Sequence, residues 1–285
     1  MFVSGPRDGP AGLRALLAAR DLDRARLVAG QSGQFHVGTS CMEFTGERMV
    51  PGSTPVSVVE HHVDRYAFAQ PLALGARILD VACGVGYGTD MLKRSGAKLA
   101  VGVDICREAV MFAHLTYGSA GTLFVIGDAV ELPFSDGAFD LTVSFETIEH
   151  VPIPADFLSE VYRTLSRYGT LIISTPNRRV WSPGSVGRMR PTNPFHVHEF
   201  EQLEFHALLR RFFPLVGMFA QNELSSMRYL VDYSPLARVV RPLRSLAARG
   251  PERGTAPRRR ICKWQPGSVP RYLVAVCSKK PSASP

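Results

Sequence analysis

The sequence predicts an α/β fold in which short buried strands alternate with amphipathic helices. Apolar runs rich in Val, Ile and Leu recur from residue 77 onward, helix-length segments separate them, and Gly, Asp or Pro bounds each run. Right-handed crossovers between such strands give a Rossmann-like, doubly wound sheet. We expect seven strands, mostly parallel, with the last strand antiparallel.

The elements follow in order along the chain. The expected strands are 77–82, 98–104, 122–128, 139–145, 169–175, 214–220 and 271–278. The expected helices are 61–69, 86–95, 106–117 and 154–167, one near 200–212 and one around 224–248. No internal repeat and no second domain are apparent.

Composition suggests one domain with an N-terminal extension. Residues 1–41 combine Gly, Pro, Ser and Gln clusters with one weak helical pattern, so we expect poor order there and consider Met42 as an alternative start to Met1. Residues 42–285 form the domain, with insertions near 177–197 and 222–268. No stretch approaches the roughly 20 apolar residues that a membrane span needs. Five scattered cysteines lack disulfide or zinc spacing, so we expect a cytoplasmic protein without a membrane span.

The net charge of +8 comes from a single segment. Residues 238–263 contain nine Lys or Arg and one acid, whereas the rest of the chain holds 24 basic and 24 acidic residues. This segment is rich in Pro, Gly and Arg and has no interleaved aromatic residues on which bases could stack. A solvated loop is therefore favoured over an RNA-binding patch.

The stretch "ILDVACGVGYG", residues 78–88, predicts a strand, a glycine turn and a helix N-terminus. Gly84 and Gly86 would let the backbone approach a ligand closely, although a turn that only packs a helix on a strand is an alternative. The glycines run G-x-G-x-G, whereas a pyrophosphate cofactor requires G-x-G-x-x-G. Asp80 would repel a pyrophosphate but tolerates a sulfonium or an ammonium group.

Two further acids end the next strands. Asp104 ends the second strand, where a carboxylate can accept both hydroxyls of a ribose. Asp128 ends the third strand, where it would receive the adenine amine or act only as a helix N-cap. The backbone N–H of Ala129 would serve a ring nitrogen. The pattern predicts nucleotide binding and leaves dehydrogenases and methyltransferases to be separated.

Four linked stretches separate them. "LDVACGVGYG", "VGVDI", "GDAVELPFSDGAFDLTVSFETIEHV" and "GTLIISTPN" resemble, in order and spacing, class I S-adenosylmethionine-dependent methyltransferases, particularly the ubiquinone-biosynthesis-like, type 11 group. The resemblance implies a methyltransferase domain that binds S-adenosylmethionine. The implied cofactor residues are Asp80, Ala82, Gly84, Gly86, Asp104, Ile105, Asp128, Ala129 and Phe145. On the helix before the first strand, Arg65 or Tyr66 would reach the methionine carboxylate, unless both belong to a solvated helix face.

The stretch "FETIEHVP" supplies the candidate catalytic groups. On a helix, Glu146 lies three residues before Glu149 and four before His150, so the three would share one face. Pro152 limits this to a single turn at the carboxyl end of strand four, where open α/β sheets bind ligands. The turn has three interpretations: a surface turn without chemistry, a His150 general base oriented by Glu149 or Glu146, or a site for Mg, Mn or Zn.

A metal site needs a further ligand. "ETIEH", "STPN" and "HVHEFE" together resemble the small-RNA 3′-terminal 2′-O-methyltransferases. This resemblance implies Glu146, Glu149, His150 and His198 as ligands of a divalent cation. The sequence departs from those enzymes at Gln202, where they have tryptophan, and related sugar and lipid methyltransferases have a similar histidine stretch.

The expected function is O-methylation of a hydroxyl on a small-molecule acceptor such as a sugar, a glycolipid or a secondary metabolite. The Glu/His cluster favours oxygen, because an oxygen acceptor requires proton removal. The alternatives are an RNA 2′-O-methyltransferase with the 238–263 segment as an electrostatic arm, a small-molecule N-methyltransferase, and a non-catalytic S-adenosylmethionine-binding protein.

Overall fold

The computed structural model describes residues 54–183, 191–226, 228–229, 233, 261–265 and 267–280. The expected disorder of 1–41 and the start at Met42 lie outside these residues. So do nearly all of the basic segment and most of the helix expected around 224–248. Within the described ranges, no helix has both the length and the apolar character that crossing a membrane requires.

The elements agree with the expected order. The strands are β1 (Arg77–Val81), β2 (Leu99–Asp104), β3 (Thr122–Ile126), β4 (Phe139–Phe145), β5 (Leu165–Pro176), β6 (Leu215–Ser225), β7 (Cys262–Lys263) and β8 (Ser268–Ser278). The α-helices are α3 (Val56–Ala69), α4 (Tyr87–Arg94), α5 (Arg107–Tyr117), α6 (Pro154–Thr164), α7 (Arg178–Trp181) and α8 (Gln202–Arg210). Two short 3₁₀ helices are η2 (Gln70–Leu72) and η3 (Ile148–His150).

The strands form one mixed sheet in the order β3-β2-β1-β4-β5-β8-β6-β7. Neighbouring strands from β3 to β5 pair in parallel, β8 is antiparallel to both β5 and β6, and β7 is antiparallel to β6. The predicted α/β class is confirmed. The strand count of seven was short by one, because the two-residue β7 is too brief to show any alternation of apolar and polar residues.

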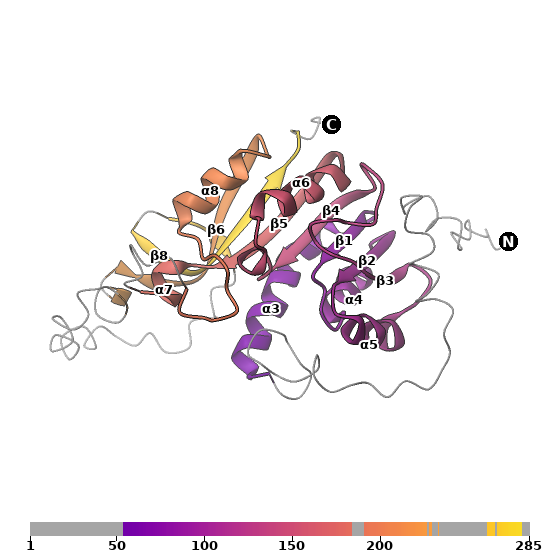
Figure 1. Cartoon of the computed structure of the whole chain (residues 1–285), viewed down its shortest axis with the longest axis horizontal. Helices are drawn as coiled ribbons and strands as arrows, with labels where there is room; N and C mark the ends of the chain where they lie inside the picture. Colours follow the sequence, from indigo (N-terminus) through magenta and orange to yellow (C-terminus); the bar gives the residue numbers. More distant parts are fainter. Residues whose placement is uncertain are drawn as a thin grey trace.

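Helices cover both faces of the sheet. Figure 1 shows α6 and α8 on one face and α3, α4 and α5 on the other. Side chains alternate accordingly along β1: Leu79 and Val81 join the core that contains Phe157 of α6, whereas Ile78 joins the core that contains Leu92 of α4. The apolar runs of the sequence therefore reflect strands that are buried on both sides.

The strand order places a ligand site between β1 and β4. β1 pairs with β2 on one side and with β4 on the other, so the crossovers leave in opposite directions at this point. Open α/β sheets bind ligands in the crevice outside the carboxyl ends of the strands at such a switch. Asp80 near the end of β1 and Glu146 directly after β4 both lie there.

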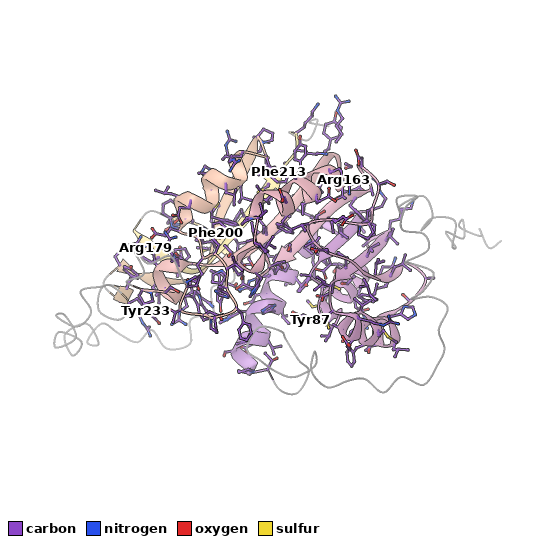
Figure 2. All side chains as sticks on the ribbon, in the orientation of Figure 1. Tyr87, Arg163, Arg179, Phe200, Phe213 and Tyr233 are labelled. Carbon is purple, nitrogen blue, oxygen red and sulfur yellow. The ribbon has the colours of Figure 1, made fainter. Side chains whose placement is uncertain are left out.

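The boundary between α6 and β5 differs from the sequence prediction. The helix expected over 154–167 ends at Thr164, and β5 already begins at Leu165. The guanidinium of Arg163, in the last turn of α6, donates to the backbone oxygens of Phe134 (2.7 Å) and Leu132 (3.0 Å). Figure 2 shows Arg163 and Phe213 on the same side of the sheet. The guanidinium thus fixes the loop that follows β3 against α6.

Candidate functional site

The glycine turn after β1 has left-handed backbone at three residues. Ala82, Gly84 and Gly86 have φ values of +61°, +55° and +84°. A methyl group on Gly84 would meet nothing within 4 Å, whereas one on Gly86 would approach the Ala113 Cβ to 2.5 Å. Gly84 therefore faces open space, and Gly86 permits close packing of α4 against α5. The packing interpretation holds for Gly86, and the approach of a ligand to Gly84 stays a prediction.

Asp104 at the end of β2 is tied to this turn. Its carboxylate accepts the N–H of Gly84 at 2.8 Å and that of Cys106 at 2.9 Å. The side chain is 5% exposed. These two bonds orient the carboxylate beside Gly84, which is the juxtaposition that a ribose-binding role requires.

The remaining predicted adenine-side residues line the neighbouring strand ends. Ile105, directly after β2, is 68% exposed. Asp128, two residues beyond β3, is also exposed, and its carboxylate accepts the N–H of Val130 at 3.1 Å. Ala129 is partly buried against the larger core. All of these residues lie at the same edge of the sheet as Asp104, because β1, β2 and β3 are parallel.

Asp80 is buried near the end of β1, just before the glycine turn. Its carboxylate accepts the hydroxyl of Tyr66 at 3.1 Å and that of Thr89 at 2.7 Å. Burial raises the pKa of Asp80 to about 7, and the two hydroxyl donors oppose this rise. A cationic group beside this carboxylate would replace its lost hydration.

Tyr66 holds Asp80 because Gly88 makes room for it. A methyl group on Gly88 would lie 1.9 Å from the nearest carbon of the Tyr66 ring. The Tyr66 ring also meets the rings of Phe145 and Tyr87 edge-on, with centroids 5.0 and 5.4 Å away. The sequence analysis did not identify Gly88 or Thr89 as site residues. The third glycine of G-x-G-x-G was the available signal.

Arg65 enters the site from the same helix. It is 1% exposed, and its Nε donates to Gln221 at 2.8 Å. The guanidinium carbon lies 4.4 Å from the centre of the Tyr272 ring, and Nη2 lies 3.5 Å from Glu146. Nη1 is buried and has no hydrogen-bond partner among the described residues. The alternative of a solvated helix face is therefore wrong for Arg65 and for Tyr66, which is 4% exposed.

Glu146 is fixed by the neighbouring strand. Its φ is +53°, and its carboxylate accepts the Ser174 hydroxyl at 2.6 Å. Its backbone N–H donates to the backbone oxygen of Ser174 at 3.2 Å, which continues the pairing of β4 with β5. Together with the Arg65 contact, these bonds hold Glu146 at the boundary between β4 and the turn that follows.

Glu149 is a completely buried carboxyl group. Its Oε2 accepts the Thr175 hydroxyl at 3.0 Å, and its Oε1 has no partner within the described part of the chain. Burial and the neighbouring charge of Glu146 raise the pKa of Glu149 well above its ordinary value. An oxygen that is buried and unpaired in a polar site is a position for a ligand or a proton.

Two histidines face Glu149. The Nδ1 of His150 lies 3.0 Å from the backbone oxygen of Phe195, and the rings of His150 and His196 are 5.0 Å apart. The Nδ1 of His196 lies 2.7 Å from the Glu199 carboxylate. One potential ligand atom from each of Glu149, His150 and His196 falls within 4.8 Å of the others. Glu199 and His196 form a histidine–carboxylate pair that the sequence analysis missed.

The structure does not bring the predicted set of Glu146, Glu149, His150 and His198 together, and two of its members need correction. Glu146 is held by Ser174 and Arg65, outside the group around Glu149. His198 is exposed and its ring lies against Phe200, 4.4 Å between centroids. The residue facing Glu149 is His196, because a turn closed by its N–H to the Asn193 oxygen, 3.2 Å, folds the chain back. Spacing alone could not choose between two histidines that are separated by one residue.

A family model described as a methyltransferase domain matches residues 79–173. A probable S-adenosylmethionine-dependent methyltransferase of Mycolicibacterium smegmatis is 34% identical over 171 residues, covering 60% of this chain and 64% of that protein. A second such protein, of Mycobacterium tuberculosis, is 34% identical over 169 residues, with coverages of 59% and 60%. The chain thus spans less than two thirds of the length of these relatives.

Solved structures share the fold at low identity. A methyltransferase of Thermotoga maritima, described as a possible histamine N-methyltransferase, superposes with a TM-score of 0.52 at 19% identity, covering 79% of this chain and 96% of that one. The cyclase SpnF has a TM-score of 0.51 at 18% identity, with coverages of 91% and 93%. The fold therefore carries more than one chemistry. The matched domain and the curated relatives show that residues 79–173 form a methyltransferase domain similar to those of S-adenosylmethionine-dependent methyltransferases.

Proposed function

We propose that this protein transfers a methyl group from S-adenosylmethionine to a hydroxyl oxygen of a small molecule. The observation that carries the proposal is the buried carboxyl of Glu149 between His150 and His196, at the carboxyl end of β4 and beside the glycine turn. An oxygen acceptor must lose a proton, and these groups supply a place for it.

The residues of the glycine turn fit the methyl donor. S-adenosylmethionine, when bound, supplies an electrophilic methyl group on a sulfonium. Asp104 would accept the ribose hydroxyls, and Asp80 would face the cationic portion of the molecule. The unpaired Nη1 of Arg65 would bind the methionine carboxylate. Gly84 leaves the space in which the donor would lie.

His150 is the proposed general base. Its Nδ1 faces a backbone carbonyl, which can only accept, so in the neutral ring Nδ1 carries the hydrogen and Nε2 carries the lone pair. Nε2 would take the proton of the hydroxyl while its oxygen takes the methyl group from the sulfonium, and the sulfur keeps the electron pair of the broken bond. The Glu149 carboxyl, in its ionised form, would compensate the new positive charge on the imidazole.

A divalent cation is a second candidate occupant of the same groups. Glu149, His150 and His196 would be its ligands, and Glu199 would orient His196 from behind. The unpaired Oε1 of Glu149 favours this hypothesis. Such a cation lowers the pKa of a bound hydroxyl. The mixture of oxygen and nitrogen ligands suits Mg, Mn or Zn.

The names of relatives do not choose the acceptor. A fatty-acid O-methyltransferase of Mycolicibacterium smegmatis is 34% identical over 112 residues, and the ajmaline N-methyltransferase of Rauvolfia serpentina is 33% identical over 110. The Glu/His cluster supports oxygen over nitrogen, because a neutral amine attacks without a base. We propose a small-molecule acceptor rather than RNA. The two are distinguished by salt, because binding of RNA would fall steeply with salt concentration through counterion release.

Calorimetric titration tests the proposal in two steps. We expect S-adenosylmethionine to bind and NAD not to bind; the reverse would refute the donor assignment. Turnover is then followed as transfer of labelled methyl from S-adenosylmethionine to pools of hydroxyl and amine compounds. Binding of the donor without turnover on any pool would favour a non-catalytic protein.

The metal hypothesis has a matched pair of variants. Titration with Mn²⁺ should show one site in the wild type that is lost in Glu149→Ala and in His196→Ala. His198→Ala removes a histidine that lies outside the cluster and should leave Mn²⁺ binding unchanged. If activity persists in EDTA while His150→Ala abolishes it, the base hypothesis is supported and the cation is excluded.

A further inference from the structure

Four large apolar side chains are exposed around the proposed acceptor site. Ile153, Trp181, Phe195 and Val197 are 56%, 44%, 51% and 52% exposed, and we call them the apolar rim. Isolated exposed apolar residues are ordinary, but a group of them beside a polar site marks a surface that contacts a ligand.

The backbone joins three rim residues to the catalytic groups. The carbonyl of Phe195 meets the Nδ1 of His150 at 3.0 Å. The N–H of Val197 donates to the backbone oxygen of Glu149 at 2.8 Å. Ile153 follows His150 by three residues. Each of these three residues is therefore hydrogen-bonded to His150 or Glu149 or lies close to them in the sequence.

Trp181 borders the site from α7. Its ring lies 5.5 Å from that of Tyr272, over which the Arg65 guanidinium stacks. The N–H of Arg178 donates to the oxygen of Phe200 at 2.9 Å, so α7 runs beside the loop that carries Phe195 and Val197. The rim residues thus come from three segments: the residues between η3 and α6, α7, and the loop before α8.

We infer that the methyl acceptor is an amphiphile whose hydroxyl end enters the Glu149–His150 site and whose apolar chain lies against the rim. This inference rests on the proposed O-methyl transfer. A wholly polar acceptor would leave the rim in water, whereas an apolar chain that covers the rim gains affinity from the apolar surface it buries. The buried, unpaired oxygen of Glu149 lies beside these apolar residues, and one molecule with a polar end and an apolar chain satisfies both.

A homologous series of ligands tests the inference. Methyl, butyl, hexyl and octyl β-glucosides, each below its critical micelle concentration, are titrated into protein saturated with S-adenosylhomocysteine. We expect affinity to rise about two- to fourfold per methylene while the chain extends over the rim. Phe195→Ser and Val197→Ser should flatten this slope. Leu203→Ser, at an 82% exposed position on α8, should leave it unchanged.

Other occupants of the rim give different results. Equal affinity for methyl and octyl glucosides, or an unchanged slope in both rim variants, would overturn the inference. It is also overturned if the rim variants change only the sedimentation of the protein or its binding to phosphatidylcholine vesicles. A separate titration with S-adenosylhomocysteine keeps the two proposals distinct: failure of this ligand to bind sinks the proposed function, whereas its binding without any chain-length dependence of the glucosides overturns only the inference.

Discussion

Replacing Asp80 with asparagine should stabilise the free protein and weaken donor binding. Burial raises the pKa of Asp80 from 3.8 to about 7. Between these values the folded protein holds a proton that the unfolded chain releases, so stability falls as pH rises through this window and is constant above it. At about 1.4 kcal/mol for each pH unit of the window, the full effect is roughly 4 kcal/mol.

Urea denaturation at two pH values measures this effect. The asparagine side chain stays neutral, so Asp80→Asn should raise the free energy of unfolding by about 1–2 kcal/mol at about pH 5 and by about 4 kcal/mol at about pH 8. Its amide can replace the contacts with Tyr66 and Thr89. The same variant should bind S-adenosylmethionine at least about tenfold more weakly, since it lacks the charge that faces the cationic groups.

Asp140→Asn provides the matched control. A hydrogen bond from Arg77 is the largest cause that lowers the pKa of Asp140, so its contribution exists above the ordinary pKa of 3.8 and disappears as pH falls through the lower folded pKa. The pair is partly exposed, and its loss should cost about 1 kcal/mol or less, equally at the two pH values. An Asp80→Asn stability difference that does not vary between these pH values would refute the assignment of the titration to Asp80.

Two further predictions concern packing and are checked by denaturation and by donor titration. Gly88→Ala would press a methyl group into the Tyr66 ring, so it should lower the free energy of unfolding by about 1–3 kcal/mol and weaken donor binding. Gly84→Ala should mainly weaken donor binding, with about 1 kcal/mol of backbone strain. Equal losses of stability in the two variants would contradict a packing role for Gly88 and a ligand-facing role for Gly84. Phe157→Ala should cost about 3–5 kcal/mol because the side chain is fully buried, and an effect as small as that of the 81% exposed Leu115→Ala would contradict its place in the core.

The sheet could be predicted because each buried strand has its own run of apolar residues bounded by Gly, Asp or Pro. The five parallel strands are apolar on both faces, and their order follows from general connection rules. β7 could not be predicted, since two residues carry no period. The end of α6 could not be predicted either, because Leu165 becomes extended where it pairs with Phe139 of β4, a residue distant in the sequence.

The positions of Asp80 and Asp104 were more predictable than the partners of Glu149. Each aspartate lies at or near the end of a predicted strand, so its place at the edge of the sheet follows from the sequence pattern. The partners of Glu149 come from β5 and from the loop after it: Thr175 shares no local pattern with Glu149, and His196 is selected over His198 by a turn that begins at Asn193. Contacts of this kind depend on tertiary packing.

Backbone conformation explains why the three ionisable residues of "ETIEH" do not share one set of contacts. A helical face would have kept Glu146, Glu149 and His150 together, but Glu146 has φ +53° and the 3₁₀ turn begins only at Ile148. The left-handed residue bends the chain at the end of β4, as Ala82 does beyond β1, at a cost of roughly 1–3 kcal/mol. Neither residue is glycine, so the sequence gives no sign of the bend. The bend leaves the Glu146 carboxylate with Ser174 and Arg65, and it places Glu149 and His150 in the following turn, near His196.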